Sequence, residues 1–119
     1  MRWVLGVALL AVGCGDDGGG GPPHISSLTP AEAQVGAQVD VLGDNFCGEV
    51  GPGEGGACAG TVAGFVTFGT SPGVVRADVS AWMERRITVA VPSGVTGPTS
   101  VVVTVDGVPS NAKGFEVLP

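Results

Sequence analysis

Residues 91–115 place the strongest constraint on the fold of this chain, because an apolar β-branched run lies between two turn signals. The run Val101-Val102-Val103-Thr104-Val105 is followed at once by Asp106-Gly107. Both residues of an Asp-Gly pair tolerate positive φ, which a tight hairpin turn requires. The sequence therefore predicts a central strand over residues 99–105 that folds back on a segment ending at residues 115–117. Val101, Val103 and Val105 are expected to face the core.

Other short apolar segments recur between turn residues and predict further strands, over residues 25–28, 38–42, 61–68, 74–80 and 87–91. The period of two is clearest in Val39 and Val41 and again in Ile87 and Val89, as expected of half-buried strands. Residues 81–85 are expected to be a short connection, and Phe46 is expected to close one end of the core. About seven short strands without a helical period predict an all-β, immunoglobulin-like antiparallel β-sandwich.

The composition agrees with a folded all-β domain. Gly (22) and Pro (9) are frequent enough to raise the question of disorder. However, 44% of the residues are hydrophobic, only 13% are charged and the mean hydropathy is +0.42. A chain this apolar can bury a core, so we interpret the glycines and prolines as turns between strands.

The N-terminal segment predicts export. Arg2 precedes a short apolar run from residue 3 to residue 12, which is too short to span a bilayer as a helix. Residues 1–13 are therefore interpreted as a signal peptide. Ala11-Val12-Gly13-Cys14 resembles a bacterial lipoprotein signal in which Cys14 receives the acyl chains, although Leu usually stands where Ala11 is found. Cleavage by ordinary signal peptidase, with release of the protein, is the alternative.

The cysteine count favours lipidation of Cys14. Three cysteines in an exported chain leave one thiol to explain, and a lipid on Cys14 would leave Cys47 and Cys58 as a pair. Residues 14–23 would then be the lipidated cysteine and a Gly-rich tether, and the folded domain would occupy residues 24–118. We expect the mature protein at the bacterial cell envelope, at the outer membrane, or secreted if Cys14 is not acylated.

The segment between Cys47 and Cys58 is expected to be a loop without secondary structure, closed by a disulfide in an oxidising compartment. Closing so short a loop is worth about 2–3 kcal/mol in the chain-entropy model. A metal site is the alternative, but the spacing is not Cys-x-x-Cys and His24 is the only histidine. Glu49 and Glu54 match no calcium loop and are interpreted as solvated charges. No metal or cofactor is predicted.

The charge of the chain argues against nucleic acid as a partner. The formal charge is −6, and loss of Arg2 with the leader leaves four basic against 11 acidic side chains, near −7. Phosphate backbones require a cationic surface, which this composition does not supply. Arg85-Arg86 is the one basic pair, and it could contact an acidic partner or simply face solvent at the start of a strand.

No constellation of residues predicts catalysis. His24 follows two prolines beside the tether, which is a poor position for a base that must hold its geometry. Trp82 could form a stacking platform for sugar or for a protein partner together with Arg85 and Arg86. The alternative is that Trp82 covers one edge of the core. We expect any functional surface to lie away from the Asp106-Gly107 hairpin, first at the loop between the two cysteines.

Several ordered segments together resemble the IPT/TIG domain, an early-set immunoglobulin-like module. They are Ile25-Ser-Ser-Leu-Thr-Pro-Ala-Glu, Val39-Asp-Val-Leu-Gly-Asp-Asn-Phe46, Val66-Thr-Phe-Gly69, Ile87-Thr-Val-Ala-Val-Pro92 and residues 101–112 with Phe115. The resemblance covers essentially all of residues 24–118. Ala33-Gln34 and the cysteine-bounded insertion after Phe46 depart from the family pattern.

The resemblance implies a non-catalytic interaction or spacer module, because no catalytic residues accompany the family. The sequence thus predicts a cell-envelope lipoprotein that contacts the membrane through its anchor and a protein partner through its domain. A carbohydrate-binding module that uses Trp82 and adjacent loops is the alternative. A single candidate aromatic and the absence of tyrosine count against that alternative.

Overall fold

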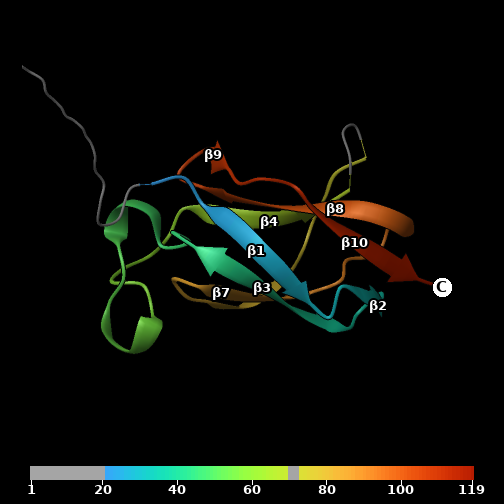
Figure 1. The fold of residues 1–119 in the computed structure, drawn as a ribbon, viewed down its shortest axis with the longest axis horizontal. Coiled ribbons are helices and arrows are strands. Elements are labelled where there is room, and N and C mark those ends of the chain that lie inside the picture. The colour runs from blue at the N-terminus through green and yellow to red at the C-terminus, as the bar shows by residue number, and fades with distance from the viewer. Residues whose placement is uncertain (1–20, 70–72) are drawn as a thin grey trace, which may run out of the picture.

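The computed structural model describes residues 21–69 and 73–119. In this part of the chain, ten strands form two sheets that pack face to face (Figure 1). The predicted all-β, immunoglobulin-like sandwich is therefore confirmed. Cys14 and the signal peptide lie outside the described residues. Within these residues, no helix has the length and apolar character that a membrane crossing requires.

The first sheet holds four strands in the order β1-β3-β7-β6. The strands are β1 (His24–Thr29), β3 (Gln38–Asp44), β7 (Arg86–Ala90) and β6 (Val79–Trp82). All three neighbouring pairs are antiparallel. Val39 pairs with Val89 and Val41 with Ile87, so the two alternating patterns seen in the sequence lie side by side in one register.

The second sheet has the order β2-β10-β8-β4-β5, with β9 beside β8. The strands are β2 (Glu32–Gln34), β10 (Lys113–Leu118), β8 (Gly97–Val105), β4 (Gly64–Phe68), β5 (Val75–Arg76) and β9 (Val108–Pro109). The predicted central strand is β8, which pairs with β10 as expected and also with β4. One pair, β2 with β10, is parallel, because the chain crosses to the second sheet after β1.

The core lies between the sheets and consists mainly of β-branched side chains. Val101, Val103 and Val105 are 0–2% exposed, which confirms that they face inward. Within the core, the rings of Phe68 and Phe115 meet edge to face, with centroids 5.4 Å apart and an interplanar angle of 87°. This is a preferred geometry for an aromatic pair. Phe46 is fully buried at the end of the sandwich, as predicted.

The Asp106-Gly107 turn has the conformation that its sequence predicts. Asp106 has φ 52° and Gly107 has φ 82°. Two successive positive φ values match the right-handed twist of the strands on either side. Val105 then pairs with Val108, and β9 returns beside β8.

The strand expected over residues 74–80 is wrong as a single element. The chain changes sheets there: the Ala77 N–H donates to Val66 O in the second sheet, and the Asp78 carbonyl accepts from the Ala90 N–H in the first. β5 and β6 are consequently separate strands. The short connection expected over residues 81–85 is also wrong in part, because Trp82 belongs to β6. A crossing between sheets leaves no signal in a pattern of alternating side chains.

Asn111 joins the segment between β9 and β10 to the edge strand β1. Its Oδ1 accepts a hydrogen bond from the Ile25 N–H at 2.7 Å, and its Nδ2 donates to the Ile25 carbonyl at 3.0 Å. The neighbouring Ser110 also binds a backbone group: its Oγ accepts a hydrogen bond from the Val103 N–H at 2.9 Å. A side-chain amide therefore satisfies both backbone groups of a buried residue at a sheet edge.

We predict that Asn111→Ala lowers the free energy of unfolding by about 1–3 kcal/mol, because the Ile25 N–H and carbonyl lose their partners. Asn111→Asp should also destabilise the domain, since a carboxylate cannot donate to the Ile25 carbonyl. Urea denaturation would measure both. The control is Thr96→Ala at an exposed position, which should change stability by less than about 0.5 kcal/mol. If the Asn111→Ala variant were as stable as the wild type, the stabilising role of the Asn111–Ile25 hydrogen bonds would be contradicted.

Candidate interaction site beside the disulfide loop

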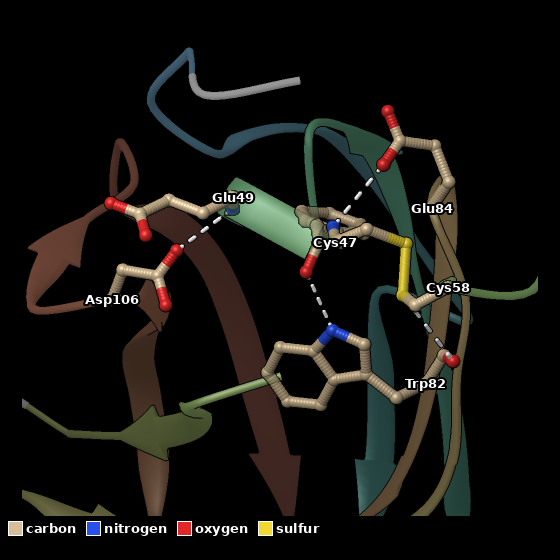
Figure 2. Close-up of a disulfide and its surroundings, with 7 residues drawn as sticks. Cys47, Glu49, Cys58, Trp82, Glu84 and Asp106 are labelled. Carbon is tan, nitrogen blue, oxygen red and sulfur yellow. Dashed lines mark hydrogen bonds between the residues drawn. A yellow bond between two sulfur atoms is a disulfide. The ribbon is translucent and has the colours of Figure 1, made fainter. Parts of the chain in front are cut away.

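Cys47 and Cys58 form a disulfide at one end of the sandwich, with an S–S distance of 2.01 Å and Cα atoms 5.2 Å apart (Figure 2). Residues 47–58, here called the disulfide loop, begin directly after the buried Phe46. Cys47 is itself 1% exposed. The loop therefore begins within the core at the end of the sandwich.

The expectation of a loop without secondary structure is wrong. The disulfide loop contains two short 3₁₀ turns, η2 (Gly48–Val50) and η3 (Glu54–Gly56), and Pro52 forms an isolated β-bridge with Cys58. A second bridge joins Ala57 to Met83, and the Glu84 N–H donates to the Gly56 carbonyl at 2.9 Å. The loop thus covers the chain just beyond β6, at an edge of the first sheet.

The disulfide loop is also attached to the Asp106-Gly107 hairpin. The Glu49 N–H donates to Asp106 Oδ2 at 2.9 Å (Figure 2). Gly48 has φ +60°, and a Cβ added there would collide with the Asp106 carboxylate and lie 2.5 Å from Val105 Cγ1. The expectation that the disulfide loop lies away from this hairpin is therefore wrong. The carboxylate of Asp106 fixes the loop to the second sheet.

Trp82 braces the other side of the loop. Its indole N–H donates to the Phe46 carbonyl at 2.6 Å, and the Trp82 carbonyl lies 4.0 Å from the Cys58 sulfur (Figure 2). Its six-membered ring lies against Gly64, where an added Cβ would come within 2.8 Å of two ring carbons. The half-buried Trp82 packs against the core and covers one edge of it. Its polar atom is engaged within the domain.

Glu84 joins the turn between β6 and β7 to the start of the loop. Its Oε1 accepts a hydrogen bond from the Cys47 N–H at 3.2 Å (Figure 2). On the backbone, the Phe46 N–H donates to the Glu84 carbonyl at 3.1 Å. Trp82 and Glu84 therefore hold residues 46 and 47 from two directions, and the position of the disulfide follows from these contacts.

An open groove of about 520 Å³ lies between the disulfide loop and this turn. Its lining residues are Leu42, Pro52, Gly56, Met83, Glu84, Arg85 and Arg86. Trp82 is not among them, so the three residues predicted to share a binding surface are divided. Arg85 and Arg86 line the groove, whereas Trp82 supports the neighbouring chain.

The groove lining combines two guanidinium groups with apolar side chains, and Glu84 also lines it. The Arg85 side chain is 82% exposed, and its Nη1 lies 3.8 Å from Asp44 Oδ1. A pair this exposed contributes little stability, so its guanidinium can be turned toward a ligand at small cost. Arg86 lies over Met83, with 4.0 Å between Nη2 and the sulfur. Guanidinium groups beside Leu42, Met83 and Pro52 suit a ligand that offers both oxygens and an apolar group.

Within residues 21–69 and 73–119, no three His, Cys, Asp or Glu side chains gather where they could hold a cation. The groove places the guanidinium groups of Arg85 and Arg86 beside apolar side chains. The profile of the IPT/TIG domain family matches residues 23–117.

The chain belongs to the IPT/TIG domain family. The resemblance seen in the sequence is thus confirmed over the whole sandwich. This family consists of non-catalytic immunoglobulin-like modules. Comparison with curated proteins finds no match to this IPT/TIG chain.

Solved structures contain similar domains. The domain resembles part of gamma-CGTase from alkalophilic Bacillus clarkii, with a TM-score of 0.64 and 26% identity over 87% of this chain and 13% of that one. A Bacteroides thetaiotaomicron protein of unknown function gives a TM-score of 0.64 at 20% identity, over 83% of this chain and 22% of that one.

An auxiliary nutrient binding protein from Bacteroides thetaiotaomicron gives a TM-score of 0.53 at 16% identity, over 83% of this chain and 21% of that one. The chain therefore spans between 13% and 22% of the length of these three structures. At 20% and 16% identity, the two Bacteroides proteins share the fold alone.

The residues that build the site were mostly not evident in the sequence. Asp106 was interpreted only as a turn residue, and Glu84 was placed in a connection. Met83, Pro52 and Leu42 carry no motif and meet only because three separate segments converge. One local signal was present: a glycine directly after the buried Cys47 marks a position where the chain turns sharply.

We predict that Gly48→Ala destabilises the domain more than Gly55→Ala does. Both glycines have positive φ, and an added Cβ would meet nothing at Gly55, where φ is 67° and ψ is 19°. Gly55→Ala should therefore cost only about 1–2 kcal/mol for the left-handed backbone. Gly48→Ala should cost about 1–3 kcal/mol more, because overpacking against Asp106 and Val105 is added. Equal free energies of unfolding in urea would show that the loop does not rest on the hairpin.

Proposed function

We propose that this IPT/TIG domain is a non-catalytic interaction module, held at the bacterial cell envelope by acyl chains on Cys14. The groove between the disulfide loop and the turn after β6 is its contact surface. The observation that carries this proposal is the presence of two exposed guanidinium groups beside apolar side chains on a braced part of the domain. Contact residues on loops held by a rigid scaffold are typical of binding modules.

The chemistry of the groove favours a protein segment as its occupant. A segment with carboxylate or carbonyl oxygens could form hydrogen bonds with Arg85 and Arg86, and such bonds are stronger when one partner is charged. An adjacent apolar side chain could lie over Leu42 and Met83. The net charge of the chain is negative, so the two arginines would select an oxygen-bearing segment by close contact and not by long-range attraction.

The second candidate is a carbohydrate-binding module, which the likeness to part of gamma-CGTase favours. Trp82 is the aromatic residue that would stack on a sugar. Its engagement with Phe46 and Gly64 leaves less of the ring for such contact. Retention of the protein on an immobilised polysaccharide, and loss of retention in Trp82→Ala, would favour this candidate over the first.

The proposed anchor rests on the position of Cys14 in Ala11-Val12-Gly13-Cys14. Several acyl chains on one cysteine make membrane attachment stable, whereas a single chain is marginal.

We predict that the mature protein in a bacterial host begins at acylated Cys14 and partitions with membranes. Cys14→Ala should abolish acylation and release the protein. Mass spectrometry of the N-terminal peptide would measure this, and an unmodified, released wild-type chain would contradict the anchor.

We predict that a photo-crosslinking amino acid in place of Met83 captures an envelope protein, and that Arg85→Ala combined with Arg86→Ala lowers the yield about 10-fold or more. The physical reason is the loss of two charge-assisted hydrogen bonds, each worth about 1.5–3 kcal/mol. The matched control is Arg76→Ala, because Arg76 lies 4.0 Å above the Phe65 ring on the second sheet, away from the groove. Its yield should match wild type.

The same crosslinker in place of Val35, at the opposite end of the sandwich, tests the placement. Val35 is 49% exposed and therefore accessible. Capture at residue 35 without capture at residue 83 would contradict the groove as the contact surface. Capture at residue 83 that is indifferent to the arginine pair would contradict the proposed chemistry.

A further inference from the structure

The chain enters the sandwich at the same end as the candidate site. Asn45 Nδ2 donates to the Pro22 carbonyl at 3.2 Å, and a Cβ on Gly21 would lie 2.9 Å from the same Nδ2. Gly21 and Pro22 also line a small hollow with Gly48, Glu49 and Asp106. The described part of the chain thus begins, at Gly21, against the disulfide loop, whereas the C-terminus lies at the opposite end (Figure 1).

Covalent geometry limits how far this end can lie from an acyl group on Cys14. Seven residue steps separate Cys14 from Gly21. A fully extended chain rises at most about 3.6 Å per residue, so the two Cα atoms are no more than about 25 Å apart in any conformation. The opposite end is separated from this one by the length of β8, whose nine residues span about 30 Å.

We propose that the end of the sandwich formed by the disulfide loop, the turn after β6 and the Asp106-Gly107 turn faces the headgroup surface of the anchoring bilayer. This end is here called the anchor end. The inference rests on the proposed lipid anchor at Cys14. It deepens the proposed function, because the groove then lies at the end of the sandwich nearest the bilayer, where Gly21 is within about 25 Å of Cys14. The protein segment that occupies the groove belongs to a partner held at that same membrane.

The charge at the anchor end sets the kind of contact. Its acidic side chains outnumber Arg85 and Arg86, and they are Asp44, Glu49, Glu54, Glu84 and Asp106. Anionic headgroups repel such a surface, and salt screens the repulsion. The anchor end therefore faces the bilayer across a layer of water without inserting. This leaves room for a partner segment between the groove and the membrane.

Paramagnetic relaxation tests this orientation without any substitution. The probe is a gadolinium-chelating headgroup lipid in nanodiscs that carry the acylated, mature full chain. We expect amide relaxation at Glu49, Gly55 and Asp106 to be enhanced several-fold more than at Gly36 and Thr96, because the effect falls steeply with distance. Raising the salt concentration should increase the enhancement at the anchor end. Equal enhancement at both ends, or stronger enhancement at Gly36 and Thr96, would overturn the proposal.

Two controls separate this inference from the proposed function. The Cys14→Ala chain, mixed with the same nanodiscs, should show no enhancement beyond that caused by soluble gadolinium chelate. A mature wild-type chain that carries no acyl group would overturn the anchor and the orientation together. An acylated chain that binds nanodiscs with the end containing Gly36 and Thr96 toward the probe would overturn the orientation alone and leave the anchor intact.

Discussion

The hydrogen bond from the Trp82 indole to the Phe46 carbonyl holds the candidate site together. Trp82 ends the edge strand β6, and Phe46 follows β3 two strands away in the same sheet. Their contact fixes residue 46 in the core, so the next residue, Cys47, starts its loop from a buried and defined position. Glu84 then holds the Cys47 N–H, and Cys58 closes the disulfide beside Trp82. The groove depends on this arrangement because its walls are the loop and the turn.

The same contacts join the two sheets at this end. Trp82 and Glu84 hold the disulfide loop to the first sheet, and Asp106 holds it to the second through the Glu49 N–H. Asn111 adds a further link between β1 and the segment that follows β9. An open sandwich has edges that must be covered or satisfied. Here the covering elements are the disulfide loop and a side-chain amide.

Local sequence patterns correctly predicted strands and the hairpin, because the conformation of these elements depends on residues that are close together in the sequence. Alternation in Val39, Val41, Ile87 and Val89 located two core strands, and Asp106-Gly107 located the hairpin, because side-chain period and turn conformation are local properties. The crossing between β5 and β6 was missed, because alternation does not reveal which sheet a strand joins. The disulfide loop was underestimated for a similar reason: its bridges, Pro52 with Cys58 and Ala57 with Met83, are formed by backbone groups and leave no signal in the side chains.

The sequence by itself determined the sandwich and the buried faces of its strands, because these follow from residue type and spacing along the chain. The family was identified from the resemblance of several segments taken in order, and the disulfide of the domain was predicted on the expectation that Cys14 carries lipid. Only the tertiary structure decided that Trp82 is a brace, that Asp106 anchors a loop 57 residues away, and that Arg85 and Arg86 border an apolar groove. These contacts join residues distant in sequence, and their partners are fixed by the packing of two sheets. That packing also places Gly21 and Pro22 against the start of the disulfide loop.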